Sequence, residues 1–294
     1  MRIEADYDAF EAGNRSNLSL EQVYFDIPKT IHQIWIGKQP PPQAWIDTWR
    51  QNYIQHCPGW SHQLWLEPDF SGLLYLNTAL LAQEDMLCGK TDIIRGAVLY
   101  QHGGLYIDAD TLWVNQHCLD DVMHLSSTTG FFAAIEPQSD SVCYHYVANG
   151  VMGAVKHHPV IWDYMQVQME FQSTKGPAVH PFERLGPLAL SEAILRADNS
   201  NCSVPDPALD SKEHPRIAWS NQVNLTGVPV AKIKLATVLH PRYFYPTTWV
   251  GVTQDVANDV VGIHAKVALE YPDAIMYQLG LSTNILLTHT STLV

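Results

Sequence analysis

The chain has 294 residues, of which 46% are hydrophobic, 10% aromatic and 16% charged, and its formal net charge is −13. This composition favours a packed core over disorder, and the length suits one large domain or two small ones. An acidic chain lacks the basic stripe of a nucleic-acid-binding surface, so we expect no nucleic-acid partner. The net charge does not exclude a local basic pocket that binds a phosphorylated ligand.

The N-terminal residues contain no apolar stretch typical of a signal peptide, and no run of about 18 apolar residues occurs anywhere in the sequence. We therefore expect no transmembrane segment and a cytoplasmic location, with peripheral contact with a membrane left open. The cysteines are odd in number and form no CxxC motif, so we expect small buried side chains in a reducing compartment. They are Cys57, Cys88, Cys118, Cys143 and Cys202.

In the first third of the chain, periodicity and turn residues predict strands and helices in alternation. Residues 1–26 are polar and acidic and indicate an N-terminal arm. Helix 91–102 ends at two glycines, which are typical helix terminators. The predicted strands are 30–36, 61–67 and 105–110, and the predicted helices are 43–56, 73–90 and 91–102.

The later part of the chain continues this pattern, with apolar run 130–136, strand 150–155, helices 159–171 and 187–197, loop 198–215, strand-like run 230–241 and short apolar run 260–267. Alternating strands and helices indicate an α/β fold. No break in composition divides the chain. We therefore expect one domain over residues 27–270, preceded by the arm 1–26 and followed by a tail, 271–294.

The segment GGLYIDAD, residues 103–110, places two aspartates one residue apart at a strand end. Because side chains alternate along a strand, Asp108 and Asp110 would point the same way and repel each other. A divalent cation removes that repulsion, and carboxylates suit Mg²⁺, Mn²⁺ or Ca²⁺. An EF-hand calcium loop is excluded, because Trp113 and Leu119 occupy its required glycine and glutamate positions.

A D-x-D pair alone is most often a solvated strand end. The preceding helix changes that balance, because Asp92 and Arg95 are three residues apart and share one helix face. On their own they would form a surface ion pair of little energetic value. Here the same helix runs through the two glycines directly into the aspartate-bearing strand.

The block KTDIIRGAVLYQHGGLYIDAD, residues 90–110, resembles the signature of glycosyltransferases with a D-x-D sugar-binding motif, family 32-like. These include initiating α-1,6-mannosyltransferases, globotriaosylceramide synthase, capsular polysaccharide glycosyltransferases and, more distantly, clostridial glucosylating toxins. IPKTIHQIWIG upstream matches the family's opening strand. NGVMGAVKHHPV, LGP, FYP and the late His264 follow in the family's order, so the resemblance spans about residues 27–266.

The resemblance implies a GT-A fold, a Rossmann-like α/β domain with a mixed central sheet flanked by helices. It implies a metal-dependent retaining enzyme that moves a hexose from a UDP- or GDP-sugar donor to a glycan or glycolipid acceptor. The implied cofactor is Mn²⁺ or Mg²⁺. Within this resemblance, Trp35 stacks on the base, and Asp92 and Arg95 face the sugar and its phosphates.

The family pattern also implies that Tyr106 lies near the ribose and that Asp110 binds the metal. The implied catalytic residues are Asp108, Asp110 and Arg95, and the implied metal ligands are Asp108, Asp110 and His264. The implied nucleotide-sugar-binding residues are Ile34, Trp35, Asp92, Arg95, Tyr106, Asp108, Ala109 and Lys266. The sequence departs from the family after His264, where Lys266 and Tyr271 stand in place of a tryptophan.

No residue stands out as a covalent nucleophile, because Glu136, Asp140 and Glu183 are acids without a distinguishing motif. This favours attack of the acceptor from the face that the diphosphate leaves. Three other functions remain open at this point. They are an effector-like enzyme that modifies a protein side chain, a silent nucleotide-sugar or glycan-binding module, and a metal phosphohydrolase, which normally needs a denser cluster of ligands.

Overall fold

A computed structural model describes residues 24–136, 146–198, 230–233, 235–246 and 259–279. The strands are β1 (Thr30–Ile34), β2 (Ser61–Trp65), β3 (Gly104–Ile107), β4 (Thr111–Trp113), β5 (Phe131–Ile135), β6 (Val147–Ala154), β7 (Val230–Ile233), β8 (Ala236–Leu239) and β9 (Met276–Gln278). The longer helices are α5 (Leu87–His102), α7 (Pro159–Lys175), α9 (Pro187–Asp198) and α11 (Val260–Glu270). The shorter ones are α2 (Gln43–Asp47), η1 (Thr48–Tyr53), α3 (Ile54–His56), η2 (Glu67–Gly72), α4 (Thr78–Gln83), α6 (Asp120–Ser126), α8 (Pro181–Arg184) and η4 (Pro241–Tyr243).

The central sheet has the strand order β2-β1-β3-β6-β5-β8-β7, and β4 pairs with β9 in a separate ribbon. β1 is parallel to β2 and β3, and β5 is parallel to β8. β6 runs antiparallel to both β3 and β5, so the carboxyl ends of β1, β3, β5 and β8 share one edge. The expected α/β fold with a mixed sheet is confirmed.

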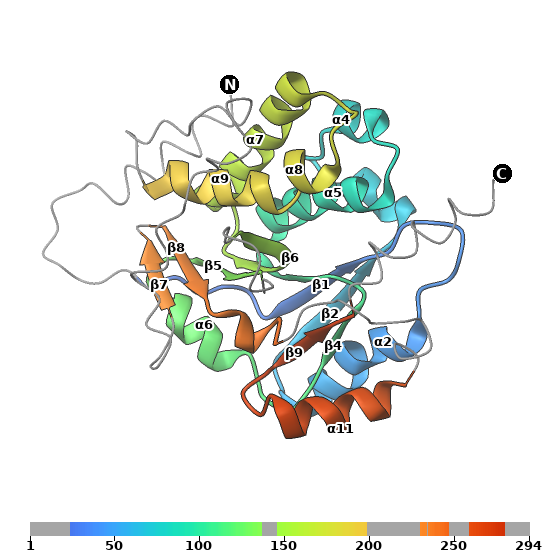
Figure 1. Cartoon of the computed structure of the whole chain (residues 1–294), viewed down its shortest axis with the longest axis vertical. Coiled ribbons are helices and arrows are strands. Elements are labelled where there is room, and N and C mark those ends of the chain that lie inside the picture. The colour runs from blue at the N-terminus through green and yellow to red at the C-terminus, as the bar shows by residue number, and fades with distance from the viewer. Residues whose placement is uncertain (1–23, 137–145, 199–229, 234, 247–258, 280–294) are drawn as a thin grey trace, which may run out of the picture.

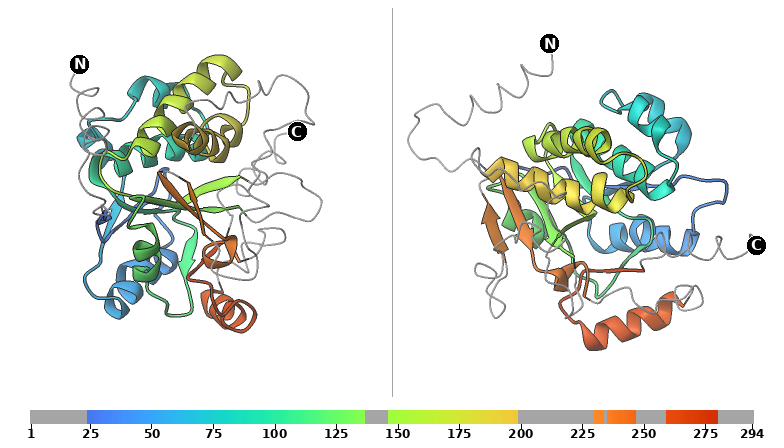
Figure 2. Two further views of the ribbon diagram at one scale, coloured as in Figure 1. Left: turned by 90° about the vertical axis from the view of Figure 1, so that its left-hand side faces the viewer. Right: turned by 45° about the horizontal axis from the view of Figure 1, so that its top comes forward.

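Helices cover both faces of this sheet (Figure 1). α4, α5, α7, α8 and α9 lie over one face, whereas α2, α6 and α11 lie on the side of the β4–β9 ribbon. Two further views show the same three layers (Figure 2). No described helix is both long and apolar enough to cross a bilayer.

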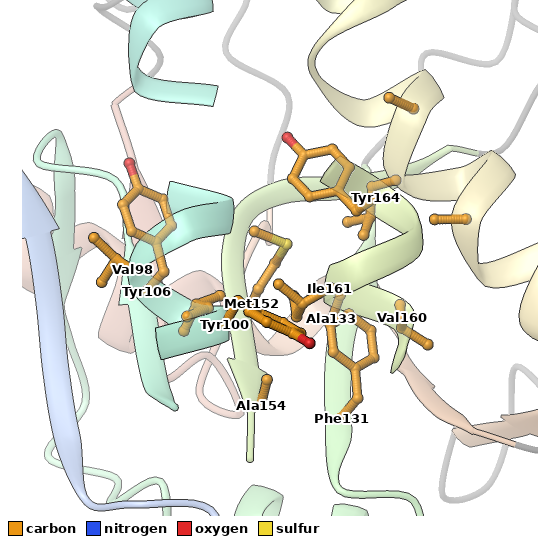
Figure 3. Packing of buried hydrophobic residues seen from close by; sticks show 14 of the residues in the cluster. Val98, Tyr100, Tyr106, Phe131, Ala133, Met152, Ala154, Val160, Ile161 and Tyr164 are labelled. Atoms are coloured by element: carbon orange, nitrogen blue, oxygen red, sulfur yellow. The ribbon is translucent and has the colours of Figure 1, made fainter. Parts of the chain in front are cut away.

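The central strands are apolar on both faces, as a sheet covered on both sides requires. Along β5, Phe131 and Ala133 pack under α5 and α7, while Phe132 and Ala134 pack on the opposite face. Figure 3 shows the first of these clusters, in which Tyr164 and other residues of α7 lie over β5 and β6.

β6 carries an irregularity that shapes the edge of the sheet. Ala133 pairs with Met152 and Ala134 with Ala148, so residues 149–151 of β6 have no partner on β5. Bulges of this kind bend a strand and redirect its side chains, and they are common beside active sites.

One predicted helix differs from the structure, and one apolar run proves to be helical. The helix expected over 73–90 is divided, because Glu84 adopts an extended conformation between α4 and α5. Its carboxylate pairs with the buried Arg184 instead. The apolar run 260–267, to which the sequence assigned no secondary structure, forms α11. Asp259 caps its first turn by accepting a hydrogen bond from the Gly262 N–H.

The expectation of unpaired cysteines is wrong for Cys57 and Cys118, which form a disulfide with a Cα–Cα distance of 5.9 Å. Sequence spacing could not reveal this, because the two residues are 61 positions apart and meet only after folding. Cys88 is free. Cys143 and Cys202 lie outside the described residues, as do Asp140, most of the arm 1–26 and residues 280–294 of the tail. The cytoplasmic location stays a prediction.

Candidate functional site

Two glycines connect α5 to β3 and bring the helix's charged face to the strand. Gly103 and Gly104 have φ values of +64° and +92°, which L side chains rarely adopt. A Cβ on Gly104 would also lie 2.6 Å from the Thr30 carbonyl oxygen. The glycines therefore allow β3 to pair closely with β1 while α5 packs above it.

Arg95 lies at the centre of the site and is only 4% exposed. Its Nη2 atom is 3.1 Å from Asp92 Oδ1 and 3.2 Å from Asp108 Oδ1. Its Nη1 atom donates to the Asn149 carbonyl at 2.6 Å, and its guanidinium lies over the Tyr106 ring. Burial by itself would lower the pKa of Arg95, but Asp108, Tyr106 and Asp92 raise it well above its ordinary value, so it stays charged.

Asp108 is held by side chains from three separate elements. Besides Arg95 of α5, the Tyr106 hydroxyl of β3 donates to Oδ1 at 2.7 Å, and Gln278 Nε2 of β9 donates to Oδ2 at 2.9 Å. The side chain keeps 17% of its surface exposed. Asp108 is therefore a carboxylate of fixed orientation at the carboxyl end of β3, where open α/β sheets bind ligands.

Asp92 is more deeply buried than Asp108 and belongs to the supporting layer. Asn149 Nδ2 donates to its Oδ1 at 2.7 Å and lies 3.0 Å from the Tyr164 hydroxyl. Burial raises the pKa of Asp92 to about 7, although Arg95 and Asn149 act in the opposite direction. Asp92 therefore orients Arg95 and Asn149 from behind the exposed edge.

Gly150, in the β6 bulge, leaves the space that the Asp108 carboxylate occupies. A Cβ at this position would lie 2.7 Å from Asp108 Oδ2, 3.1 Å from Gln278 Nε2 and 3.2 Å from the Tyr245 hydroxyl. The Asp108 backbone N–H also donates to the Gly150 carbonyl at 2.8 Å. The bulge thus places Asn149 toward α5 and the bare Gly150 against Asp108.

The other residues expected to bind the nucleotide sugar occupy different environments. Ile34 and Tyr106 are buried in the core, and Ala109 is nearly so. Trp35 follows β1 at the same sheet edge, is partly buried, and donates from its indole N–H to the Gln39 carbonyl at 2.7 Å. Lys266 is exposed on α11. Trp35 therefore places a partly exposed aromatic ring at the edge of the sheet where β1 ends.

The predicted metal ligands are not all brought together. Asp110 is buried at the turn between β3 and β4, and its carbonyl accepts from the Leu279 N–H at 2.8 Å. His264 lies on α11, and within the described ranges no group of three His, Cys, Asp or Glu side chains could hold a metal ion. The carboxylates of Asp108 and Asp110 suit a hard divalent cation that takes its remaining ligands from a diphosphate and water. Among the described residues, Asp108, Asp110 and His264 do not together form a group of three such ligands, and the role of His264 stays a prediction.

Sequence reasoning missed several residues of the site. Gln33 Nε2 donates to the Asp108 carbonyl at 3.3 Å, and Tyr245 approaches Gly150 from the segment after η4. Asn149 and Gly150 lie in the NGVMGA segment, which offered a weak signal. Gln278 stands in no motif and contacts Asp108 across 170 residues of sequence.

No family model matches the chain, but individual proteins do. An uncharacterized glycosyltransferase of Acanthamoeba polyphaga mimivirus is 30% identical over 195 residues, which cover 64% of this chain and 73% of that protein. Inositol phosphoceramide mannosyltransferase 3 of Schizosaccharomyces pombe is 28% identical over 139 residues, or 46% of this chain. The aligned segment spans 35% of that mannosyltransferase.

Among solved structures, the PaToxG glycosyltransferase aligns with a TM-score of 0.44 and 16% identity, over 66% of this chain and 78% of that one. The viral match combines 30% identity with 73% of the relative's length. On that basis, this chain belongs to the same family of glycosyltransferases.

Proposed function

We propose that this glycosyltransferase, which uses a nucleotide-sugar donor, is metal-dependent and retaining and transfers a hexose to a glycan or glycolipid acceptor. The observation that supports the proposal best is the fixed Asp108 carboxylate, held by Arg95, Tyr106 and Gln278 at the carboxyl end of β3. Such an arrangement presents carboxylate oxygens at a constant position, as a site for a diphosphate-bound divalent cation needs.

In this proposal, the carboxylates of Asp110 and Asp108 would hold Mn²⁺ or Mg²⁺. When bound, the cation would neutralise the negative charge that develops on the departing diphosphate. Arg95 does not contact the donor directly in this proposal, because its guanidinium already contacts Asp92, Asp108 and the Asn149 carbonyl. Its role is to hold the Asp108 carboxylate in place, and Trp35 is the proposed platform for the base.

The proposed transfer proceeds on one face of the sugar. The bond between the anomeric carbon and the diphosphate oxygen breaks, and its electron pair stays on that oxygen. The acceptor hydroxyl attacks from the same face and passes its proton to the departing diphosphate, so the configuration at the anomeric carbon is retained. The names of the Schizosaccharomyces pombe relatives favour a mannose donor and an inositol-containing glycolipid as the first acceptor to test.

The test is hydrolysis of UDP- and GDP-sugars with and without Mn²⁺. We expect slow cleavage of one donor that needs the cation, and Asp110→Asn should lower it by about 10²- to 10³-fold, because one charged ligand is lost. The exposed Asp85→Asn is the matched control and should cleave at the wild-type rate. A hydrolysis rate that changes neither with Mn²⁺ nor with Asp110→Asn would exclude the proposed metal site. A transfer product with inverted anomeric configuration would exclude a retaining mechanism.

A further inference from the structure

Glu136 is a buried carboxylate that the proposed chemistry has not used. It follows β5 directly, and its backbone N–H donates to the Tyr146 carbonyl at 2.8 Å, which extends the ladder with β6 by one residue. Glu136 is only 8% exposed. Within the described part of the chain, its Oε2 atom has no hydrogen-bond partner.

The position of Glu136 relates it to the site at Asp108. β3 and β5 flank β6 in the sheet and end at the same edge (Figure 1). Their ends are separated by two spacings between hydrogen-bonded strands, which is roughly 10 Å. Glu136 is thus too far from Asp108 to share its contacts, yet near enough to line the same ligand.

Tyr245 lies between these two carboxylates. Because side chains alternate along a strand, Glu136 points to the face of Phe132 and Ala134, which pack in one cluster with Tyr245. The Tyr245 hydroxyl also approaches Gly150 beside Asp108. Burial raises the pKa of Tyr245 well above its ordinary value, and the charges of Asp108 and Glu136 raise it further, so all three groups face one region.

We propose that Glu136 accepts a hydrogen bond from a hydroxyl of the transferred sugar and so helps to select the donor. This inference rests on the proposed transfer from a nucleotide sugar. A buried carboxylate oxygen without a partner is unfavourable unless a ligand supplies a donor, and a hexose is rich in hydroxyl donors. With the diphosphate bound beside Asp108, the sugar is the part of the donor that extends toward β5.

We expect the fold not to depend on the Glu136 carboxylate. Burial raises the pKa of Glu136 to about 7, because the ionised carboxylate is poorly solvated in the folded chain. Replacing it by an uncharged side chain of similar size should therefore preserve the fold or stabilise it. Donor binding should weaken in the same variant, which separates a ligand contact from a structural one.

The experiment is calorimetric binding of GDP-mannose and UDP-glucose, with GDP and UDP as sugar-free probes, in the presence of Mn²⁺. Glu136→Leu should weaken binding of the recognised sugar nucleotide about 10- to 100-fold, while binding of its nucleoside diphosphate changes by no more than about twofold. Glu136→Gln keeps an acceptor oxygen and should lie between wild type and Glu136→Leu. The exposed Glu183→Gln is the matched control and should bind like wild type.

Equal weakening of the sugar nucleotide and its diphosphate, or no weakening of either, would overturn the assignment of Glu136 while leaving the transferase proposal intact. A wild-type protein that binds none of the four probes would overturn the transferase proposal and this one with it. Melting temperatures of the variants at pH 8 verify that they fold, and a large loss in Glu136→Leu would mean that Glu136 is structural.

Discussion

Gly150→Ala is the smallest change that should disable the site, since it adds one methyl group in the β6 bulge. The new Cβ would lie 2.7 Å from Asp108 Oδ2, whereas ordinary van der Waals contact begins at 3.4 Å. The carboxylate must therefore move by about 0.7 Å or the bulge must open by as much. Either shift lengthens the 2.9 Å bond from Gln278 and the 3.2 Å contact with Arg95.

Misplacing a positioning group by about 1 Å can lower an enzymatic rate by about 10²-fold, so we expect donor hydrolysis to fall by about 10- to 100-fold. Overpacking should lower the free energy of unfolding by about 1–3 kcal/mol, which urea denaturation measures. Gly72→Ala is the control, because no atom lies within 4 Å of its Cβ position. Wild-type hydrolysis by a folded Gly150→Ala protein would refute the close packing of Asp108 against β6.

Two further predictions concern stability. The Cys57–Cys118 disulfide joins residues 61 positions apart, so Cys57→Ser with Cys118→Ser should lower the free energy of unfolding by about 4 kcal/mol. An unchanged melting temperature under dithiothreitol would contradict the pairing. Burial raises the Glu136 pKa from 4.5 to about 7, so the folded state binds the extra proton between these values. Protonation of Glu136 therefore adds to the free energy of unfolding. This contribution is complete below pH 4.5 and is lost as the pH rises through about 7. Glu136→Gln should flatten this part of the stability profile in denaturation experiments from pH 4 to 8.

The local segments of the site could be predicted because their determinants are close in sequence. Asp92 and Arg95 share a face through helix periodicity, and the glycines at 103 and 104 end α5 before β3 begins. Asp108 and Asp110 follow at the strand end, where ligands of α/β proteins bind. The alternation of apolar strands and helices was enough to predict the fold class.

Tertiary structure decided which groups surround Asp108. Gln278 reaches it because β9 pairs with β4, and Gly150 makes room for it through a bulge that strand periodicity does not show. The positions of β5 and of the segment after η4 likewise place Glu136 near Tyr245. The folded chain also brings Cys57, which follows α3, within bonding distance of Cys118.

Sequence by itself therefore determined the α/β class and the helix–glycine–strand order of block 91–110, because spacing along a helix or strand is local geometry. Only the folded chain showed that Arg95 is buried behind Asp108 and that Glu136 has an oxygen without a described partner. It also showed that Asp108, Asp110 and His264 form no group of three metal ligands among the described residues. These facts depend on contacts between segments far apart in sequence, and no local pattern encodes such contacts.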